Sequence, residues 1–307
     1  MTDNTRPRAK PFLKWAGGKN QLLSQIEVNL PVGLKNGRIT KYAEPFIGSG
    51  SLFFFMAHQF QLTDYFIADI NKDLILAYRV IQQEAEALIQ LLGDIQNKYL
   101  PMQPSQREAY FYDTRTAFNE NQSTISYEAT DPTSIQRVAQ LIFLNRTCFN
   151  GLYRVNSKGE FNVPFGRHKK PKICAAKNLR RVSQLLEMCQ IHHGDFTACR
   201  DFVDEQTFVY FDPPYRPLNQ TASFNTYAQK RFDDAEQQRL ANFYQELAAQ
   251  GTALMLSNSD PHNEDPTDNF FQTLYAGFTI QKVTARRIIN SDGAKRGNIT
   301  EILVTNY

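Results

Sequence analysis

The chain has 307 residues, 42% of them hydrophobic and 21% charged, and can therefore bury a large core in one or two domains. No apolar run approaches the roughly 20 residues that cross a bilayer, and the start of the chain is polar and basic, which argues against a membrane protein and against export. The net charge of +3 hides two basic clusters, because residues 1–20 carry +4 and residues 141–172 carry +6 while the remainder carries −7. Such clusters suit a polyanion such as nucleic acid, although charge alone is explained equally well by a solvated face.

Short apolar runs bounded by turns predict seven strands, at 41–46, 64–70, 188–196, 208–215, 252–259, 278–287 and 299–307. Helical patterns follow some of these strands, at 49–60, 176–188 and 233–250. The alternation is interrupted once, between 71 and 187, where the pattern predicts helices at 73–96, 104–120 and 131–145 and then a basic, turn-rich stretch. The sequence therefore predicts an α/β protein that carries a mostly helical insertion.

The first two predicted strands end in residues that suit a nucleoside ligand. EPFIGSGSLF (44–53) places Gly48 and Gly50 at a strand-to-helix turn, where a ligand can approach the backbone. Asp69, at the end of the second strand, suits a ribose or an amino group. The turn lacks the third glycine of the dinucleotide fingerprint, and GGK near residue 17 lacks the rest of a P-loop, which disfavours nicotinamide and ATP.

The stretch VYFDPPY (209–215) joins a buried strand to an acid, two prolines and an aromatic ring. If this strand is central and parallel, Asp212 emerges near the glycine turn, because open α/β sheets bind ligands at the carboxyl ends of their strands. Asp212 and the Pro213 carbonyl can accept the two N–H bonds of an exocyclic amine, and Tyr215 can stack on the ring that bears the amine. Pro213 and Pro214 hold these groups stiffly, since proline fixes φ.

Cysteine and histidine give little sign of a metal site. The four cysteines lack CxxC spacing, which disfavours zinc and disulfides and is typical of a reduced, cytoplasmic protein. His192 and His193 are adjacent on a predicted strand and should point to opposite faces, so we expect both to be structural.

Five motifs follow one another along the chain: FLKWAGGK (12–19), EPFIGSGSLF, ADIN, DPPY and NGLYRVNSKGEFNVPFGRHKKP (150–171). In this order they closely resemble the bacterial DNA adenine methyltransferase (Dam) family, including its restriction-associated GATC-modifying relatives. The resemblance covers nearly the whole chain, and the first and last motifs are more diagnostic than DPPY. It implies a Rossmann-like methyltransferase sheet with an antiparallel seventh strand, formed by residues 1–70 and 173–307, and a target-recognition domain with a β-hairpin at residues 71–172.

The resemblance also implies a cofactor and its contacts. The methyl donor would be S-adenosylmethionine, with no metal, and the catalytic group would be Asp212, Pro213, Pro214 and Tyr215. The residues matching the cofactor contacts of the family are Trp15, Lys19, Asp69 and Asp212, above a floor of Phe46, Gly48 and Gly50, with Asp195 beside the cofactor's adenine. Tyr215 would stack on a target adenine extruded from the duplex, under a loop at 217–227.

The basic stretch after residue 148 is predicted to read double-stranded DNA. YRVNSKGEFNVP (153–164) alternates around a turn at residues 156–159, which indicates a two-stranded ribbon suited to the major groove. Phe149 stands where the archetype of the family has tyrosine, so stacking into the duplex survives but a hydroxyl contact does not. The resemblance gives DNA contacts to Lys14, Phe149, Asn150, Leu152, Arg154 and Pro164, with Leu152 and Arg154 as readers of base pairs, and we expect Arg167, Lys169 and Lys170 to contact phosphates.

The sequence thus predicts an S-adenosylmethionine-dependent DNA methyltransferase that acts on N6 of adenine within GATC. Two alternatives stay open: a cytosine N4-methyltransferase, since the same amine-holding site could serve cytosine, and a DNA-binding protein that has lost catalysis. The intact DPPY, glycine turn and KWAGGK count against the second alternative. A cognate restriction endonuclease would be a partner by function, not necessarily by contact.

Overall fold

The computed structural model describes residues 8–216, 232–286 and 298–307, which contain one seven-stranded sheet in the order β3-β2-β1-β4-β5-β7-β6. Neighbouring strands from β3 to β5 pair in parallel, whereas β7 runs antiparallel to both β5 and β6. All seven predicted strands and the antiparallel seventh strand are confirmed. Their bounds are β1 Lys41–Glu44, β2 Asp64–Asp69, β3 Cys189–His193, β4 Thr207–Phe211, β5 Ala253–Ser259, β6 Thr279–Arg286 and β7 Asn298–Thr305.

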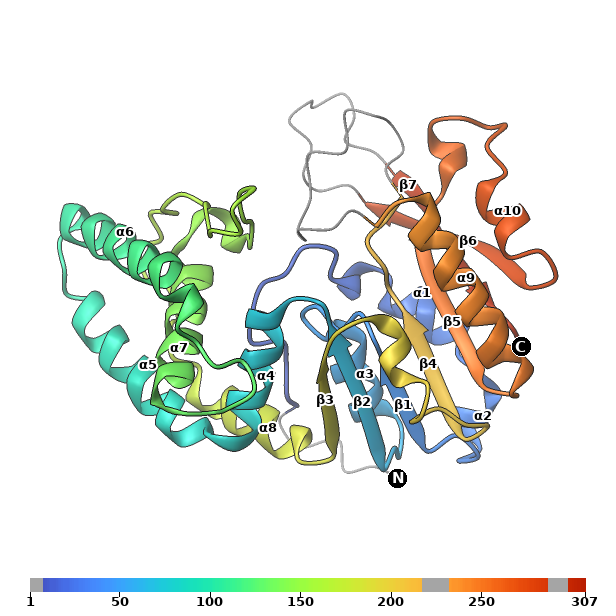
Figure 1. The fold of residues 1–307 in the computed structure, drawn as a ribbon, viewed down its shortest axis with the longest axis horizontal. Coiled ribbons are helices and arrows are strands. Elements are labelled where there is room, and N and C mark those ends of the chain that lie inside the picture. The colour runs from blue at the N-terminus through green and yellow to red at the C-terminus, as the bar shows by residue number, and fades with distance from the viewer. Residues whose placement is uncertain (1–7, 217–231, 287–297) are drawn as a thin grey trace.

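Both faces of the sheet are buried, because successive side chains of its central strands belong to two different hydrophobic clusters. On β4, for example, Phe208 and Tyr210 join one cluster and Val209 and Phe211 join the other. The first cluster continues into α3 (Ser51–Gln59), and the second into α9 (Asp234–Ala249). Figure 1 shows these helices on opposite sides of the sheet, which gives the three layers of an α/β protein.

The helices of the insertion lie beside the β3 edge of the sheet (Figure 1). The predicted helix at 73–96 is wrong in one respect: it is two helices, α4 and α5, separated at Glu84, whose φ of −129° and ψ of 35° are not helical. After the break, α4 packs on β3, α7 and α8, and α5 packs on α7 and α8. The α-helices not yet given are α1 Leu23–Val28, α2 Val32–Lys35, α4 Lys72–Gln83, α5 Ala85–Tyr99, α6 Pro104–Glu120, α7 Pro132–Thr147, α8 Ala176–Leu186 and α10 Phe270–Leu274.

A buried ion pair joins α4 to α7. Arg137 binds both carboxylate oxygens of Asp73, with its Nε 2.6 Å from Oδ1 and its Nη2 3.0 Å from Oδ2, and the Tyr127 hydroxyl donates to the same carboxylate at 3.2 Å. Since breaking a fully buried pair leaves one charge unpaired, this contact fixes α7 to α4, the helix of the insertion that packs on β3.

The predicted hairpin is present, but its arms are not regular strands. The turn closes through the Gly159 amide, which donates to the Asn156 carbonyl at 2.9 Å, and the arms meet at an isolated bridge between Val155 and Phe161. The hairpin is therefore short, and the Asn162 amide bonded to the Arg154 carbonyl at 3.0 Å is its next rung.

None of the helices in the described part of the chain is long and apolar enough to span a membrane. All four cysteines are described, and each is a free thiol.

Candidate active site

The glycine turn and Asp69 meet at the edge where the parallel strands end. The Gly48 amide donates to Asp69 Oδ2 at 3.1 Å, and the Asn71 amide donates to Oδ1 at 2.9 Å. Burial raises the pKa of Asp69, and these backbone donors oppose the shift. Gly48 and Gly50 have φ of 48° and 70°, in the left-handed region that favours glycine, so the turn depends on both residues.

The N-terminal motif lies directly on this turn. A Cβ atom at Gly48 would come within 3.2 Å of Trp15 Cδ1, and the Trp15 ring stacks on Tyr153 of the insertion with centroids 4.8 Å apart. The ring of Phe46, just before the turn, packs on that of Phe196 with centroids 5.5 Å apart. Trp15 therefore links the glycine turn of the sheet to the region that carries the hairpin.

The buried Lys19 and the half-buried Asp212 form an ion pair at the end of β4. Lys19 Nζ lies 2.7 Å from Asp212 Oδ1, and the Ser257 hydroxyl donates to the same oxygen at 3.0 Å. Within the described ranges no residue donates to Asp212 Oδ2. Burial raises the pKa of Asp212, while the ammonium and the hydroxyl favour its ionised form. The carboxylate is thus held at one oxygen and available as an acceptor at the other.

Of the two proline carbonyls of the motif, one accepts a hydrogen bond from the described residues and the other does not. The Pro214 carbonyl accepts a hydrogen bond from Gln237 Nε2 at 3.2 Å, and Gln237 is fully buried in α9. The Pro213 carbonyl receives no hydrogen bond from the residues that the structure describes. One carboxylate oxygen and one carbonyl oxygen of adjacent residues, 212 and 213, therefore remain as acceptors.

The Tyr215 side chain makes contacts at both its hydroxyl and the face of its ring. The hydroxyl donates to Glu301 Oε2 from β7, and Lys19 Nζ lies over the ring at 4.6 Å from its centroid. Burial raises the pKa of Glu301. Lys19 thus contacts both the acid and the ring of the DPPY motif.

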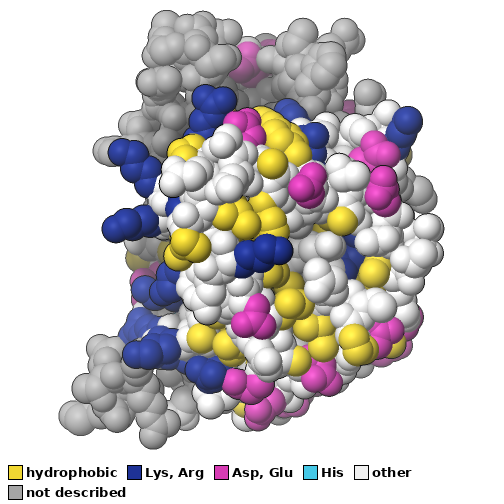
Figure 2. Space-filling model, turned by 90° about the vertical axis from the view of Figure 1, so that its left-hand side faces the viewer, with side chains coloured by type: hydrophobic (Ala, Val, Ile, Leu, Met, Phe, Trp, Pro, Cys, Tyr) yellow, Lys and Arg dark blue, Asp and Glu magenta, His cyan; other side chains and the backbone are white. Residues whose placement is uncertain are grey.

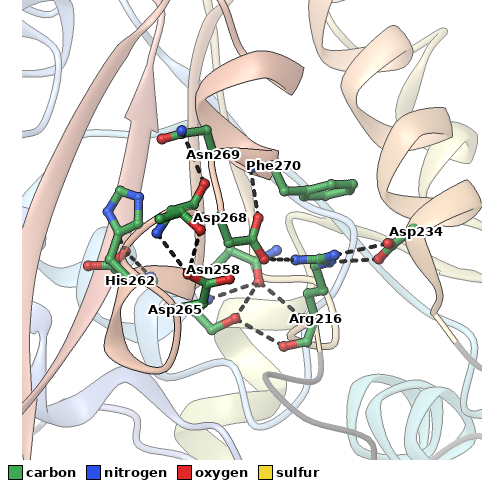
Figure 3. A network of polar contacts seen from close by, with 11 residues as sticks. Arg216, Asp234, Asn258, His262, Asp265, Asp268, Asn269 and Phe270 are labelled. Carbon is green, nitrogen blue, oxygen red and sulfur yellow. Dashed lines mark hydrogen bonds and ion pairs between the residues drawn. The ribbon is translucent and has the colours of Figure 1, made fainter.

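Arg216 anchors the chain as it leaves this motif (Figure 3). Its Nε and Nη2 bind the carboxylate of Asp234 at the start of α9, at 2.7 and 3.1 Å, and its Nη1 binds Asp268 at 2.6 Å. Its amide donates to Asn258 Oδ1 at 3.3 Å. These contacts set the direction of the backbone just after Tyr215; the loop expected at 217–227 lies outside the described residues.

Asp195 follows β3 but is occupied by contacts of its own. Its carboxylate caps the short helix at Phe196–Cys199 and binds Arg239 at 2.6 and 2.8 Å. Burial alone would raise the pKa of Asp195, but the bonds from Arg239 and Thr197 lower it to about 2. The two adjacent histidines make separate contacts: His192 stacks on Phe66 and His193 meets the Ile70 carbonyl.

The residues expected at DNA lie together around the end of α7. Asn145 bonds the Lys14 amide and carbonyl and the Gly151 carbonyl, which brings Lys14 beside the chain at 149–152. The Phe149 side chain is 51% exposed, and its amide donates to the Pro164 carbonyl at 2.8 Å. An exposed aromatic ring beside basic side chains suits stacking within a duplex.

Further along the insertion, the Arg154 side chain is exposed and bonds Asn162 Oδ1 through Nε at 2.7 Å. Figure 2 shows Lys and Arg side chains gathered along one edge of the face that the insertion presents, with Asp and Glu mostly elsewhere. Of the predicted DNA contacts not yet placed, the side chain of Leu152 is half-buried and those of Asn150, Arg167, Lys169 and Lys170 are exposed. Such an edge complements a phosphate backbone.

Four polar side chains at the site were not foreseen from the sequence: Glu44, Gln237, Ser257 and Glu301. Glu44 ends β1, accepts a hydrogen bond from the Tyr42 hydroxyl at 2.6 Å, and has a pKa that burial raises to about 8. The only signal in the sequence was a polar residue within or at the end of an apolar stretch, as for Glu44 in KYAEPF and Glu301 in ITEILV.

Residues 15–289 match the family of D12 class N6 adenine-specific DNA methyltransferases. The chain belongs to this family. The enzyme is 49% identical over 299 residues to the type II methyltransferase M.MjaIII of Methanocaldococcus jannaschii, an alignment that covers 97% of this chain and 99% of the relative. It is 37% identical to the type II methyltransferase M1.LlaDCHI of Lactococcus lactis, over 97% and 95% of the two chains, and 33% identical to the DNA adenine methylase of Escherichia coli K12, over 96% and 94%.

The predicted family and activity are confirmed: the enzyme transfers a methyl group to N6 of adenine in DNA. Membership of an adenine-specific family also decides against cytosine N4, which the sequence alone had left open. The methyl donor is of the S-adenosylmethionine type that methyltransferases use.

Proposed function

We propose that the enzyme methylates adenine within GATC in double-stranded DNA, with S-adenosylmethionine as donor and without a metal, after extruding the target base. The observation that carries the proposal is the acceptor pair at the end of β4. Asp212 Oδ2 and the Pro213 carbonyl receive no hydrogen bond from the described residues, whereas Asp212 Oδ1 and the Pro214 carbonyl are both engaged. An amine with two N–H groups matches two neighbouring acceptors.

The residues at the glycine turn fit the proposed cofactor. Gly48 and Gly50 give the turn its positive φ, and the carboxylates of Asp69 and Asp212 at this edge complement a cation. When bound, S-adenosylmethionine supplies a methyl group on a positively charged sulfur. We assign its binding to Trp15, Lys19, Phe46, Gly48, Gly50, Asp69 and Asp212. Asp195 could bind the cofactor only if its carboxylate gave up one of its two hydrogen bonds from Arg239.

The side chains of the DPPY motif would act on the target base itself. Hydrogen bonds from N6 to Asp212 and to the Pro213 carbonyl favour a more tetrahedral nitrogen whose lone pair is available for attack, and Tyr215 stacks on the extruded adenine. Positioning and electrostatics then carry most of the reduction of the barrier. After transfer the amine loses one proton, for which Asp212 is an adjacent acceptor.

We propose that residues 71–172 recognise the DNA. Exposed Arg154, on the hairpin, would donate two bonds to a guanine in the major groove, beside Leu152, while Lys14, Phe149, Asn150 and Pro164 approach the duplex from the same region. Arg167, Lys169 and Lys170 would contact phosphates, which position the protein without reading sequence. We also propose that the enzyme acts in the cytoplasm and that a cognate restriction endonuclease is its partner by function, not necessarily by contact.

The test is methylation of a random double-stranded DNA pool with purified enzyme and S-adenosylmethionine, followed by sequencing of the modified positions. We expect modified adenines within GATC and activity that survives EDTA. Modification centred on another sequence would overturn the GATC assignment, and loss of activity in EDTA would overturn the metal-free reaction.

A further inference from the structure

Glu301 is an acid between two apolar side chains on one face of β7. Side chains on one face of the strand alternate as Ile299, Glu301 and Leu303, and both isoleucine and leucine contact the hydrophobic core. A partly buried carboxylate in such a row costs free energy unless it has a partner. Its presence therefore calls for a specific contact.

The antiparallel direction of β7 gives Glu301 access to the site. The parallel strands end at the edge that carries the glycine turn and DPPY, and β7 begins at that edge, so Glu301 lies opposite Ser259, the last residue of β5. A parallel strand in the same place would bring only its last residues to this edge. The carboxylate meets the Tyr215 hydroxyl, which donates to Oε2.

This bond fixes a ring that is otherwise held only at its face. Lys19 Nζ lies 4.6 Å from the centroid of the Tyr215 ring and 2.7 Å from Asp212, so the ring, the ammonium and the carboxylate form one group. A tyrosine outside helices and strands can rotate about its side-chain torsions, and a cation over the ring face does not prevent that rotation. The hydroxyl bonded to a rigid strand does prevent it.

We propose that Glu301 is a positioning residue for methyl transfer, which holds the Tyr215 ring in the plane on which the extruded adenine stacks, with its amine toward Asp212. The proposal rests on the proposed function, in which Tyr215 stacks on the target base. Its consequence is that Glu301 affects the orientation of the base and the rate of transfer more than the binding of cofactor. A displacement of about 1 Å in a reacting group can lower a rate by about 10²-fold.

The experiment compares four variants of the full-length enzyme: Glu301→Leu, which matches the apolar neighbours; Glu301→Gln, which keeps an acceptor oxygen; Tyr215→Phe, which removes the donor; and the double variant Glu301→Leu/Tyr215→Phe. Asp204→Asn is the control, because Asp204 also accepts side-chain bonds, from Lys41 and Thr207, but precedes β4 at the opposite end of the sheet. Three quantities are measured: the single-turnover methylation rate, the Kd for S-adenosylmethionine, and the fluorescence of 2-aminopurine at the target position.

We expect Glu301→Leu and Tyr215→Phe each to lower the single-turnover rate by about 10- to 100-fold and to change the stacked 2-aminopurine signal, with the cofactor Kd within about twofold of wild type. Glu301→Gln should recover part of the rate. The double variant should lose no more than the larger single loss, because both changes break one bond. Asp204→Asn should resemble wild type.

The role of Glu301 would be overturned if the rate losses of the two single variants multiplied in the double variant. It would also be overturned if Glu301→Leu lowered the melting temperature without changing the methylation rate. If Glu301→Leu does not fold, Tyr215→Phe and Glu301→Gln still decide the matter by the same readouts. Tyr215→Ala separates this inference from the function beneath it. If Tyr215→Ala gives the 2-aminopurine signal and methylation rate of wild type, the target base does not stack on Tyr215. If Tyr215→Ala methylates slowly while the Glu301 variants and Tyr215→Phe methylate like wild type, only the role of Glu301 is refuted.

Discussion

Removal of the Ser257 hydroxyl should change the pH at which the enzyme becomes active. Ser257 is fully buried, and its hydroxyl donates to Asp212 Oδ1 at 3.0 Å, which stabilises the ionised carboxylate. Burial already raises the pKa of Asp212, so the acid depends on Lys19 and Ser257 to remain ionised. In Ser257→Ala the pKa of Asp212 should rise further, since a bond to the charged form is lost.

The size of the shift follows from the strength of the bond. A hydrogen bond to a charged group contributes about 1.5 to 3 kcal/mol, and one pKa unit corresponds to about 1.36 kcal/mol. The acid limb of kcat/KM should therefore move about one to two pH units upward in Ser257→Ala. Above that limb the activity should recover much of the wild-type value, because Asp212 is then ionised again.

The assay is kcat/KM for methylation of a duplex, measured across pH for wild type, Ser257→Ala and a control. Ser134→Ala is a matched control, because Ser134 is equally buried but donates to the Ala129 carbonyl within the insertion. The Tyr210 hydroxyl also bonds Ser257 Oγ, at 2.9 Å, and loses this partner in Ser257→Ala. The double variant Ser257→Ala/Tyr210→Phe removes that unpaired hydroxyl, so it should be more stable than Ser257→Ala but keep the same shifted acid limb. An acid limb that is unchanged in Ser257→Ala, or that moves equally in Ser134→Ala, would refute the reasoning.

Three further outcomes are expected. Burial raises the pKa of Glu44 to about 8, so the stability that the protonated Glu44 contributes is present below its unfolded pKa and is lost as pH rises toward 8. Between pH 5 and 8 the free energy of unfolding in urea should therefore fall by up to roughly 4 kcal/mol more for wild type than for Glu44→Gln. Equal pH dependence of the two proteins would contradict this. Arg154→Ala should narrow the preference in kcat/KM for GATC over sites with a substituted guanine, by about 1 to 3 kcal/mol, whereas Arg167→Ala should weaken binding to all duplexes and reduce the salt slope by about one; the reverse pattern would refute the division of roles. Asp268→Asn should lower kcat through the anchor at Arg216 and leave the cofactor Kd unchanged in calorimetry; an altered Kd with normal kcat would argue against that anchor.

The positions of the main motifs could be predicted because they depend on local patterns. The strands of the sheet are buried on both faces and appear as short apolar runs, and a parallel sheet brings the ends of neighbouring strands to one edge. For this reason Gly48, Asp69 and Asp212 were expected together, and the Gly48 amide does bond Asp69. The family motifs added the antiparallel strand, which composition and periodicity do not reveal.

Contacts made across the sheet could not be predicted in the same way. Tyr215 and Glu301 are 86 residues apart, and they meet only because β7 enters between β5 and β6 in the antiparallel direction. Ser257 reaches Asp212 through the pairing of β4 with β5, which is a matter of register. The break at Glu84 was missed because the apolar pattern continues through it, and both halves pack on α7 and α8.

The most direct test of the account is the single-turnover rate of Asp212→Ala on a GATC duplex, with the product nucleosides identified by mass. The account predicts N6-methyladenine from wild type and a rate at least about 10²-fold lower in a variant that remains folded, because an aligned acceptor for the amine is lost. A folded Asp212→Ala enzyme that methylates within a few-fold of wild type, or a wild-type product that is methylcytosine, would contradict it.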